Sequence, residues 1–133
     1  MTGVEQIHAG DQLLAVIIRA ELRPDRTTFI TPESLTQQVG FVVYPAGGEV
    51  ARHVHRPLRR ELEGTSEALV VREGRCEVDL YDNARALVAT RELTRGDVVL
   101  LVAGGHGFRM LEDTTFLEVK QGPYTGIDEK EQF

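Results

Sequence analysis

The sequence predicts an all-β protein, and three observations support this fold class. The chain of 133 residues is long enough to bury a core without disulfides. It contains 13 glycines, five prolines and no tryptophan, spread over short segments in which apolar and polar residues alternate. This alternation has the two-residue period of a strand, and no long helical pattern interrupts it. Short strands between glycine-rich turns are typical of a closed barrel or a jelly roll.

The N-terminal segment 1–35 is expected to be irregular apart from one strand. Residues 12–22 alternate weakly, and Pro24 and Asp25 end this strand. Beyond the segment, strands are expected where apolar residues run between turn formers. They cover residues 39–44, 49–55, 67–72, 76–81, 87–93, 98–102, 108–111 and 115–120.

The connections between these strands carry turn residues. The expected turns are Pro45–Gly48, residues 82–84 and residues 95–97, and residues 56–66 form a charged loop. The continuous apolar run at 98–102 indicates a strand covered on both faces. The polar tail 121–133 is expected to lie on the surface. The whole chain, 1–133, is therefore interpreted as one domain.

Charge and composition exclude several partners. The formal charge is −6 and the pI is near 5.2, which argues against duplex nucleic acid or an anionic membrane as the main partner. No secretion signal is recognisable, and the longest apolar runs, 13–18 and 98–103, are too short to span a bilayer. Cys76 is the only cysteine, so no internal disulfide can form, and its alternation with Val78 and Leu80 predicts a buried thiol. We expect a cytoplasmic protein.

His53 and His55 form an H-x-H triplet within the predicted strand 49–55. Side chains two positions apart on a strand share a face, so both imidazoles can approach one metal ion. A third histidine, His106, and the carboxylate of Glu67 are the further candidate ligands. The alternative is that the histidines are scattered and make ordinary hydrogen bonds. The fourth histidine, His8, is expected on the surface.

These residues resemble the first motif of the cupin superfamily, G-x5-H-x-H-x3-4-E-x6-G. Gly47, His53, His55, Glu67 and Gly74 match it, but eleven residues separate His55 from Glu67 where the family has three or four. Glu61, at a spacing of five, is a rival for the glutamate position. Glu67 is preferred because it opens a strand and keeps the spacing to the glycine.

The second cupin motif, G-x5-P-x-G-x2-H-x3-N, is matched less completely. Gly96, Gly104 and His106 align with it, with one residue fewer before the histidine. Val102 stands where proline is usual, and Met110 where asparagine would fall. The resemblance covers about residues 40–120. It implies a double-stranded β-helix, that is, a small jelly-roll barrel with a metal near its mouth, and a homodimer.

The resemblance implies one divalent first-row metal held by His53, His55, Glu67 and His106. Three imidazoles and a carboxylate suit Mn, Fe, Ni or Zn, and they leave coordination positions open for a small-molecule ligand. Arg56 follows this strand in a cluster with Arg52, Arg59 and Arg60, which favours an anionic ligand. The alternative is a solvated loop whose arginines pair with neighbouring glutamates.

Several other residues are candidates for the site. Glu118 and Lys120 share a face of strand 115–120 and, with Tyr44, are the candidate proton-transfer groups; an exposed pair on the outside of the barrel is the alternative that we prefer for the first two. Gln38, Phe108 and Met110, with Arg56, are candidate substrate-binding residues. Alternation after His106 predicts that Phe108 and Met110 point inward while Arg109 points outward.

Two functions follow from these expectations. The first is a small metal-dependent enzyme, of isomerase, epimerase or oxygenase type, acting on a small polar metabolite that is anionic or sugar-like. The second is a metal-stabilised module that binds or senses a small molecule without turnover. Whether Glu118 and Lys120 point into the cavity discriminates between them, because turnover needs a proton-transfer group near the bound ligand.

Overall fold

The structure, a computed structural model, describes residues 1–126 and 129–133. The chain divides into two compact units. Met1–Leu22 and Thr65–Phe133 form one unit, which we call the sandwich, and Arg23–Gly64 form the other, which we call the insert. No helix within the described residues is long and apolar enough to cross a membrane.

The prediction of an all-β protein is confirmed, since 42% of the described residues are strand and 1% are helical. Ten strands are present in the described ranges: β1 (Val4–Ala9), β2 (Gln12–Ile18), β3 (Thr28–Phe29), β4 (Gly40–Phe41), β5 (Glu67–Glu73), β6 (Arg75–Tyr81), β7 (Leu87–Thr94), β8 (Val98–Leu101), β9 (Gly105–Met110) and β10 (Thr115–Lys120).

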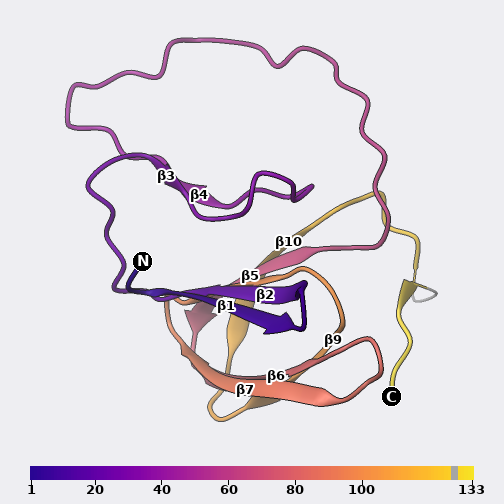
Figure 1. The fold of residues 1–133 in the computed structure, drawn as a ribbon. Helices are drawn as coiled ribbons and strands as arrows, with labels where there is room; N and C mark the ends of the chain where they lie inside the picture. Colours follow the sequence, from indigo (N-terminus) through magenta and orange to yellow (C-terminus); the bar gives the residue numbers. More distant parts are fainter. Residues whose placement is uncertain (127–128) are drawn as a thin grey trace. The chain divides into compact units, whose positions relative to one another are not determined.

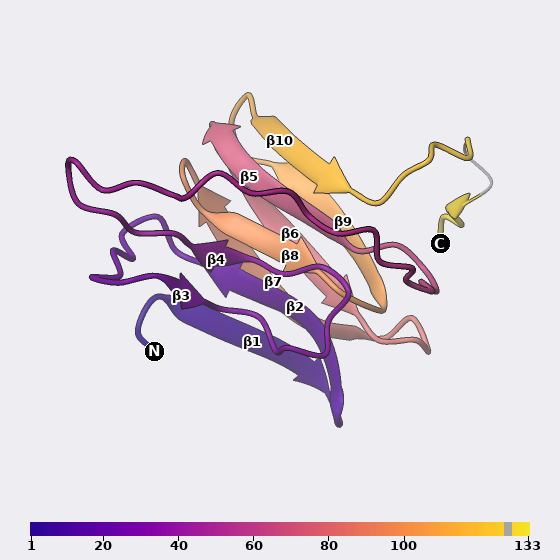
Figure 2. The ribbon, with the colours of Figure 1, turned by 90° about the horizontal axis from the view of Figure 1, so that it is seen from above.

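Two antiparallel sheets make up the sandwich (Figures 1 and 2). The larger sheet has the order β1-β2-β8-β5-β10, and the smaller has the order β7-β6-β9. Neither sheet closes into a barrel within the described residues. The structure thus establishes the all-β class and two open sheets, and not the predicted jelly-roll barrel.

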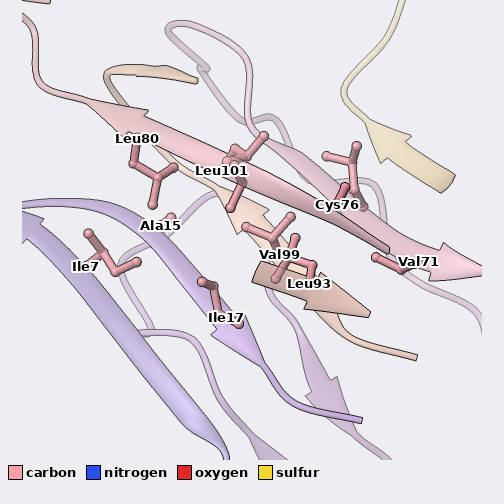
Figure 3. Close-up of a cluster of buried hydrophobic side chains, with 11 residues drawn as sticks. Ile7, Ala15, Ile17, Val71, Cys76, Leu80, Leu93, Val99 and Leu101 are labelled. Carbon is pink, nitrogen blue, oxygen red and sulfur yellow. The ribbon is translucent and has the colours of Figure 1, made fainter. Parts of the chain in front are cut away.

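The core of the sandwich lies between the two sheets. Cys76, Val78 and Leu80 alternate along β6 with no more than 1% of their surface exposed, as predicted from the sequence. They pack against side chains of the larger sheet, among them Ile17 and Val99 (Figure 3). Each Å² of apolar surface buried stabilises the folded state by about 25 cal/mol, so this contact between the sheets is the main stabilising contribution in the unit. The same burial raises the pKa of the Cys76 thiol, in keeping with a structural cysteine.

Strands β2 and β8 are buried on both faces. Five consecutive residues of β2, from Leu14 to Ile18, are buried, as are Val99, Leu100 and Leu101 of β8. The continuous apolar run therefore indicated a doubly covered strand correctly.

The predicted turn at residues 95–97 joins β7 to β8 and is held by one buried carboxylate. Asp97 is 2% exposed and accepts hydrogen bonds from the backbone N–H groups of Ala20 (2.8 Å) and Thr94 (2.9 Å) and from the Arg19 guanidinium (3.1 Å). Gly96 occupies the left-handed region with φ +89°, which favours glycine.

The sequence analysis did not predict strand β1. It pairs with β2 in a hairpin whose turn contains Gly10, with φ +60°, and Asp11. This Gly-Asp pair is a turn signal that could have revealed the hairpin.

The insert contains little regular structure. Its only strands among the described residues are β3 and β4, each of two residues, so the predicted strand 39–44 is reduced to Gly40–Phe41. The turn after it is present, with the Gly48 N–H donating to the Pro45 carbonyl at 3.0 Å. Residues 56–66 form the predicted loop.

The predicted strand 49–55 is wrong. The structure assigns no strand there, and every residue from 44 to 65 is exposed. The alternation of Val50, Arg52 and Val54 has the period of a strand, but among the described residues no neighbouring strand supplies backbone hydrogen bonds to this segment. An extended segment without such a partner gains no ladder to stabilise it.

Candidate functional site

His53 and His55 lie in the insert with their rings close together. The ring centroids are 5.2 Å apart with an interplanar angle of 60°. Nδ1 of His53 lies 2.8 Å from the carbonyl oxygen of Ala51. A proton on Nδ1 in that hydrogen bond leaves Nε2 as the nitrogen with a free lone pair, the form that ligates a metal.

Glu67 and His106 meet in the sandwich, although they come from different sheets. Glu67 begins β5 of the larger sheet, and His106 lies on β9 of the smaller one. Glu67 Oε2 and His106 Nε2 are 3.8 Å apart, with 14% and 33% of their side chains exposed. The two residues therefore connect the sheets at one half-buried point at an end of the sandwich.

Glu118 and Lys120 lie on the same face of the larger sheet as Glu67. In the antiparallel register Lys120 is opposite Glu67, and Glu118 is opposite the buried Leu69. Residues directly opposite each other on paired strands share a face. Both side chains thus lie on the core-facing side of β10, where Glu118 is exposed and Lys120 is partly buried, and not on the outer face.

The electrostatics of this cluster follow from burial and from a carboxyl pair. Burial raises the pKa of Glu67, and a hydrogen bond and charge repulsion from Glu118 raise it further, against the opposing charges of Lys130 and Lys120. Burial also lowers the pKa of His106, and the charge of Lys130 adds to this while Glu118 opposes it. The arrangement favours a neutral His106 imidazole beside a Glu67 carboxyl group that holds its proton more readily than an isolated glutamate.

The donor atoms of Glu67 and His106 fit a shared cation. Two ligand atoms that each lie about 2.1 Å from one ion are about 3 Å apart in adjacent coordination positions and about 4.2 Å apart in opposite positions. The 3.8 Å separation of Oε2 and Nε2 falls in this range. Within the described residues, however, no three His, Cys, Asp or Glu side chains form a group ready to hold a metal. The structure brings the predicted ligands together as two pairs, one in each unit.

The residues after His106 follow the predicted alternation. Phe108 and Met110 lie opposite Val78 and Cys76, so both share the core-facing side of the smaller sheet. Phe108 contacts the rings of His106 and Phe116, with centroids at 6.2 Å and 5.1 Å. Phe108 thus packs against the hydrophobic core beside His106, whereas Met110 lies at the other end of β9 with half of its surface exposed.

Arg109 points to the outer face, as predicted. Its guanidinium donates to the buried carboxylate of Asp79, which also accepts a hydrogen bond from the Thr90 hydroxyl at 2.6 Å. Glu77 lies at 3.4 Å from the same guanidinium. This outer cluster holds β6, β7 and β9 together and does not contribute to the site.

The remaining candidates lie in the insert. The side-chain amide of Gln38 donates to the carbonyls of Pro32 and Leu35, both at 2.9 Å, and accepts from the Thr31 hydroxyl at 2.8 Å, so its groups are occupied in holding a loop. Tyr44 is 52% exposed.

The arginine cluster is exposed as well. Arg56 and its neighbours Arg52, Arg59 and Arg60 form no ion pair among the described residues. Glu61, the rival of Glu67, is exposed in the same loop.

Sequence reasoning missed the contribution of the C-terminal tail. Lys130 acts electrostatically on both Glu67 and His106, and Glu129 pairs with Lys120 at 3.3 Å. No local pattern in the polar tail could have indicated this, since the contacts depend on where the chain end returns to the sandwich.

Comparison with family models, curated proteins and solved structures found no match to this chain.

Proposed function

We propose that this chain is a divalent-metal-binding protein of cupin type, in which Glu67 and His106 are metal ligands and His53 and His55 are the others. The observation that carries the proposal is the approach of Glu67 and His106 to 3.8 Å from two different sheets. The two motifs, in the cupin order along the chain, add the histidine pair of the insert, whose rings are 5.2 Å apart. The jelly-roll form of the fold is part of the same proposal.

The donor set supports a first-row ion such as Mn, Fe, Ni or Zn. Imidazole nitrogen and carboxylate oxygen are ligands that these ions share, so the donor types do not select among them. A neutral His106 favours binding because only an unprotonated ring nitrogen can donate a lone pair. When bound, the ion would polarise an oxygen of the ligand.

We further propose an enzyme of isomerase, epimerase or oxygenase type acting on a small polar, anionic or sugar-like metabolite. Glu118 and Lys120 support catalysis over mere binding, since both share the inner face with Glu67. A carboxylate and an ammonium side by side can accept and donate a proton. Lys120 is held by Glu129 at 3.3 Å, which keeps its ammonium in place and charged. A non-catalytic binding module is the alternative, and it predicts ligand binding that is insensitive to Glu118.

We also propose that the chain forms a homodimer, and the outer face of β10 supports this. Leu117 and Val119, which alternate with Glu118, are 49% and 54% exposed. β10 is an edge strand, and in the described part of the chain it pairs with β5 alone. Apolar side chains on an exposed edge favour association. Light scattering should give the mass of two chains for the parent and of one chain for the double variant Leu117→Thr, Val119→Thr; a monomeric parent would contradict this proposal.

Elemental analysis of untagged protein tests the metal proposal. The parent should contain about one metal ion per chain, and His106→Ala and His53→Ala should lose most of it. His8→Ala is the matched control, because His8 lies on β1, which carries none of the proposed ligands, and should leave the content unchanged. Stoichiometric metal that persists in both His106→Ala and His53→Ala would refute the assignment of ligands.

A further inference from the structure

The last five residues of the chain, Glu129–Phe133, contact other parts of the sandwich at both of their ends. We call this segment the strap. At its start, Glu129 Oε1 pairs with Lys120 Nζ at 3.3 Å, and Glu129 Oε2 accepts a hydrogen bond from the Thr125 hydroxyl at 2.8 Å. The first attachment point is therefore the end of β10.

The other end of the strap is attached to the smaller sheet through Phe133. Its ring meets the Tyr81 ring edge to face, with centroids 5.1 Å apart and an interplanar angle of 84°. The Arg85 guanidinium lies 5.1 Å from the Phe133 centroid and pairs with Glu131 at 2.9 Å. A Cβ on Gly105 would lie 2.8 Å from Phe133 Cζ, so the ring packs directly over this glycine and would have to move if a side chain were added there.

The two attachment points flank the candidate ligands. Lys120 is the cross-strand partner of Glu67, and Gly105 directly precedes His106. A segment fixed at both positions passes the end of the sandwich at which the two ligands meet. The charge of Lys130, in the middle of the strap, acts on both Glu67 and His106, in agreement with this course.

We propose that the strap is a cover for the site, docked by Phe133, and that it controls access to Glu67 and His106. The Phe133 end of the strap can open, because Phe133 keeps 60% of its surface exposed and the Arg85–Glu131 ion pair is 50% and 80% exposed. The docking of Phe133 does not depend on the proposed function. The conclusion that the strap gates a ligand site rests on the proposed function.

Chemical modification of the metal-free protein tests the cover. Diethyl pyrocarbonate acylates unprotonated imidazole, and peptide mass spectrometry gives the rate at each histidine. Phe133→Ala should accelerate modification of His106 about threefold or more, since the docked strap then opens more often. His8, on β1, is the internal control and should react at the parent rate. Phe133→Tyr, which keeps the ring, should behave as the parent.

A second variant removes the docking without changing the tail. Gly105→Ala places a methyl group where Phe133 packs. It should therefore increase the rate of His106 modification in the same way as Phe133→Ala. Equal ratios of His106 to His8 modification in the parent, Phe133→Ala and Gly105→Ala would overturn the cover.

The rate of cobalt uptake separates this inference from the proposed function. Phe133→Ala should take up Co²⁺ faster than the parent and to the same final amount. A parent that binds no Co²⁺ would reject the proposed metal site, while the modification rates would still decide whether the strap covers His106. Cobalt uptake at the parent rate in Phe133→Ala would show that the strap does not gate the ions.

Discussion

The sandwich and the insert use similar residues and reach different structures. In the sandwich, apolar residues such as Leu93 and Val99 are fully buried between two sheets. In the insert, Val50, Val54 and Leu58 are 57–88% exposed, and two strands of two residues are its only regular structure in the described ranges. Apolar content alone therefore does not decide whether a segment of this chain forms a strand.

The difference shows what a strand pattern needs. Residues 76–81 and 49–55 both alternate, but β6 has β7 on one side and β9 on the other, which satisfy its backbone groups. The Val50–Val54 stretch lacks such neighbours within the described residues. A two-residue period predicts which face is apolar, whereas pairing decides whether the strand forms.

The same contrast applies to the proposed ligands. Glu67 and His106 are fixed by strands of the sandwich, while His53 and His55 are on irregular chain in the insert. The first pair is preorganised, and the second would lose conformational freedom on binding.

The largest effect is expected from matched substitutions in the two units. Leu93→Ala should lower the free energy of unfolding by about 2–5 kcal/mol, because it leaves a cavity in the core. Leu58→Ala, at a position 67% exposed, should change it by less than about 0.5 kcal/mol. Urea unfolding followed by far-ultraviolet circular dichroism measures both, and equal losses would remove the distinction between the units.

Proteolysis gives the next largest difference. Trypsin should cleave after Arg59 or Arg60 faster than after Arg75 or Arg109 by on the order of a hundredfold, because cleavage within paired strands requires local unfolding. Mass spectrometry of early fragments identifies the sites. Added metal should slow cleavage in the insert of the parent and not in His53→Ala. First cuts within the sandwich strands would contradict the comparison.

A smaller effect is expected from the ion cluster on the outer face. The Arg109 hydrogen bond, and next the Thr90 hydrogen bond, hold the pKa of Asp79 below its ordinary value despite burial. This stabilisation is present above the unfolded-state pKa of about 3.9 and is lost as the pH falls through the lower folded-state value. Asp79→Asn should cost about 1–2 kcal/mol at pH 7 and progressively less below about pH 3.9.

The control for this cluster is Glu77→Gln. Its contact with Arg109 is longer, at 3.4 Å, and more exposed, so the loss should stay below about 0.5 kcal/mol. Unfolding free energies measured from pH 7 to pH 3 test both variants. A constant difference between Asp79→Asn and the parent over this range would rule out the linkage.

Much of the sandwich was predictable from sequence, because its signals are local. The alternation of Cys76, Val78 and Leu80 and the continuous run in β8 indicated burial correctly. The first and last residues of β10 were predicted correctly. Which of its side chains face the core was not, since this depends on the register with β5. β1 was missed because its own alternation is weak, and only the turn at Gly10 and Asp11 indicates its pairing with β2.

The candidate site was predictable only in its residue types. The sequence indicated Glu67 and His106 as ligands, but their approach depends on the packing of β5 against β9, which no local pattern contains. The strap was not predicted, because Phe133 and Lys130 gain their meaning from contacts with Tyr81, Gly105 and the ligand pair.

X-ray absorption at the metal edge of zinc-loaded protein tests the central claim most directly, since it counts imidazole ligands. We expect one imidazole for each of His53, His55 and His106 in the parent, and one fewer in His106→Ala. An unchanged imidazole count in His106→Ala, or zinc with no imidazole ligands in the parent, would contradict it.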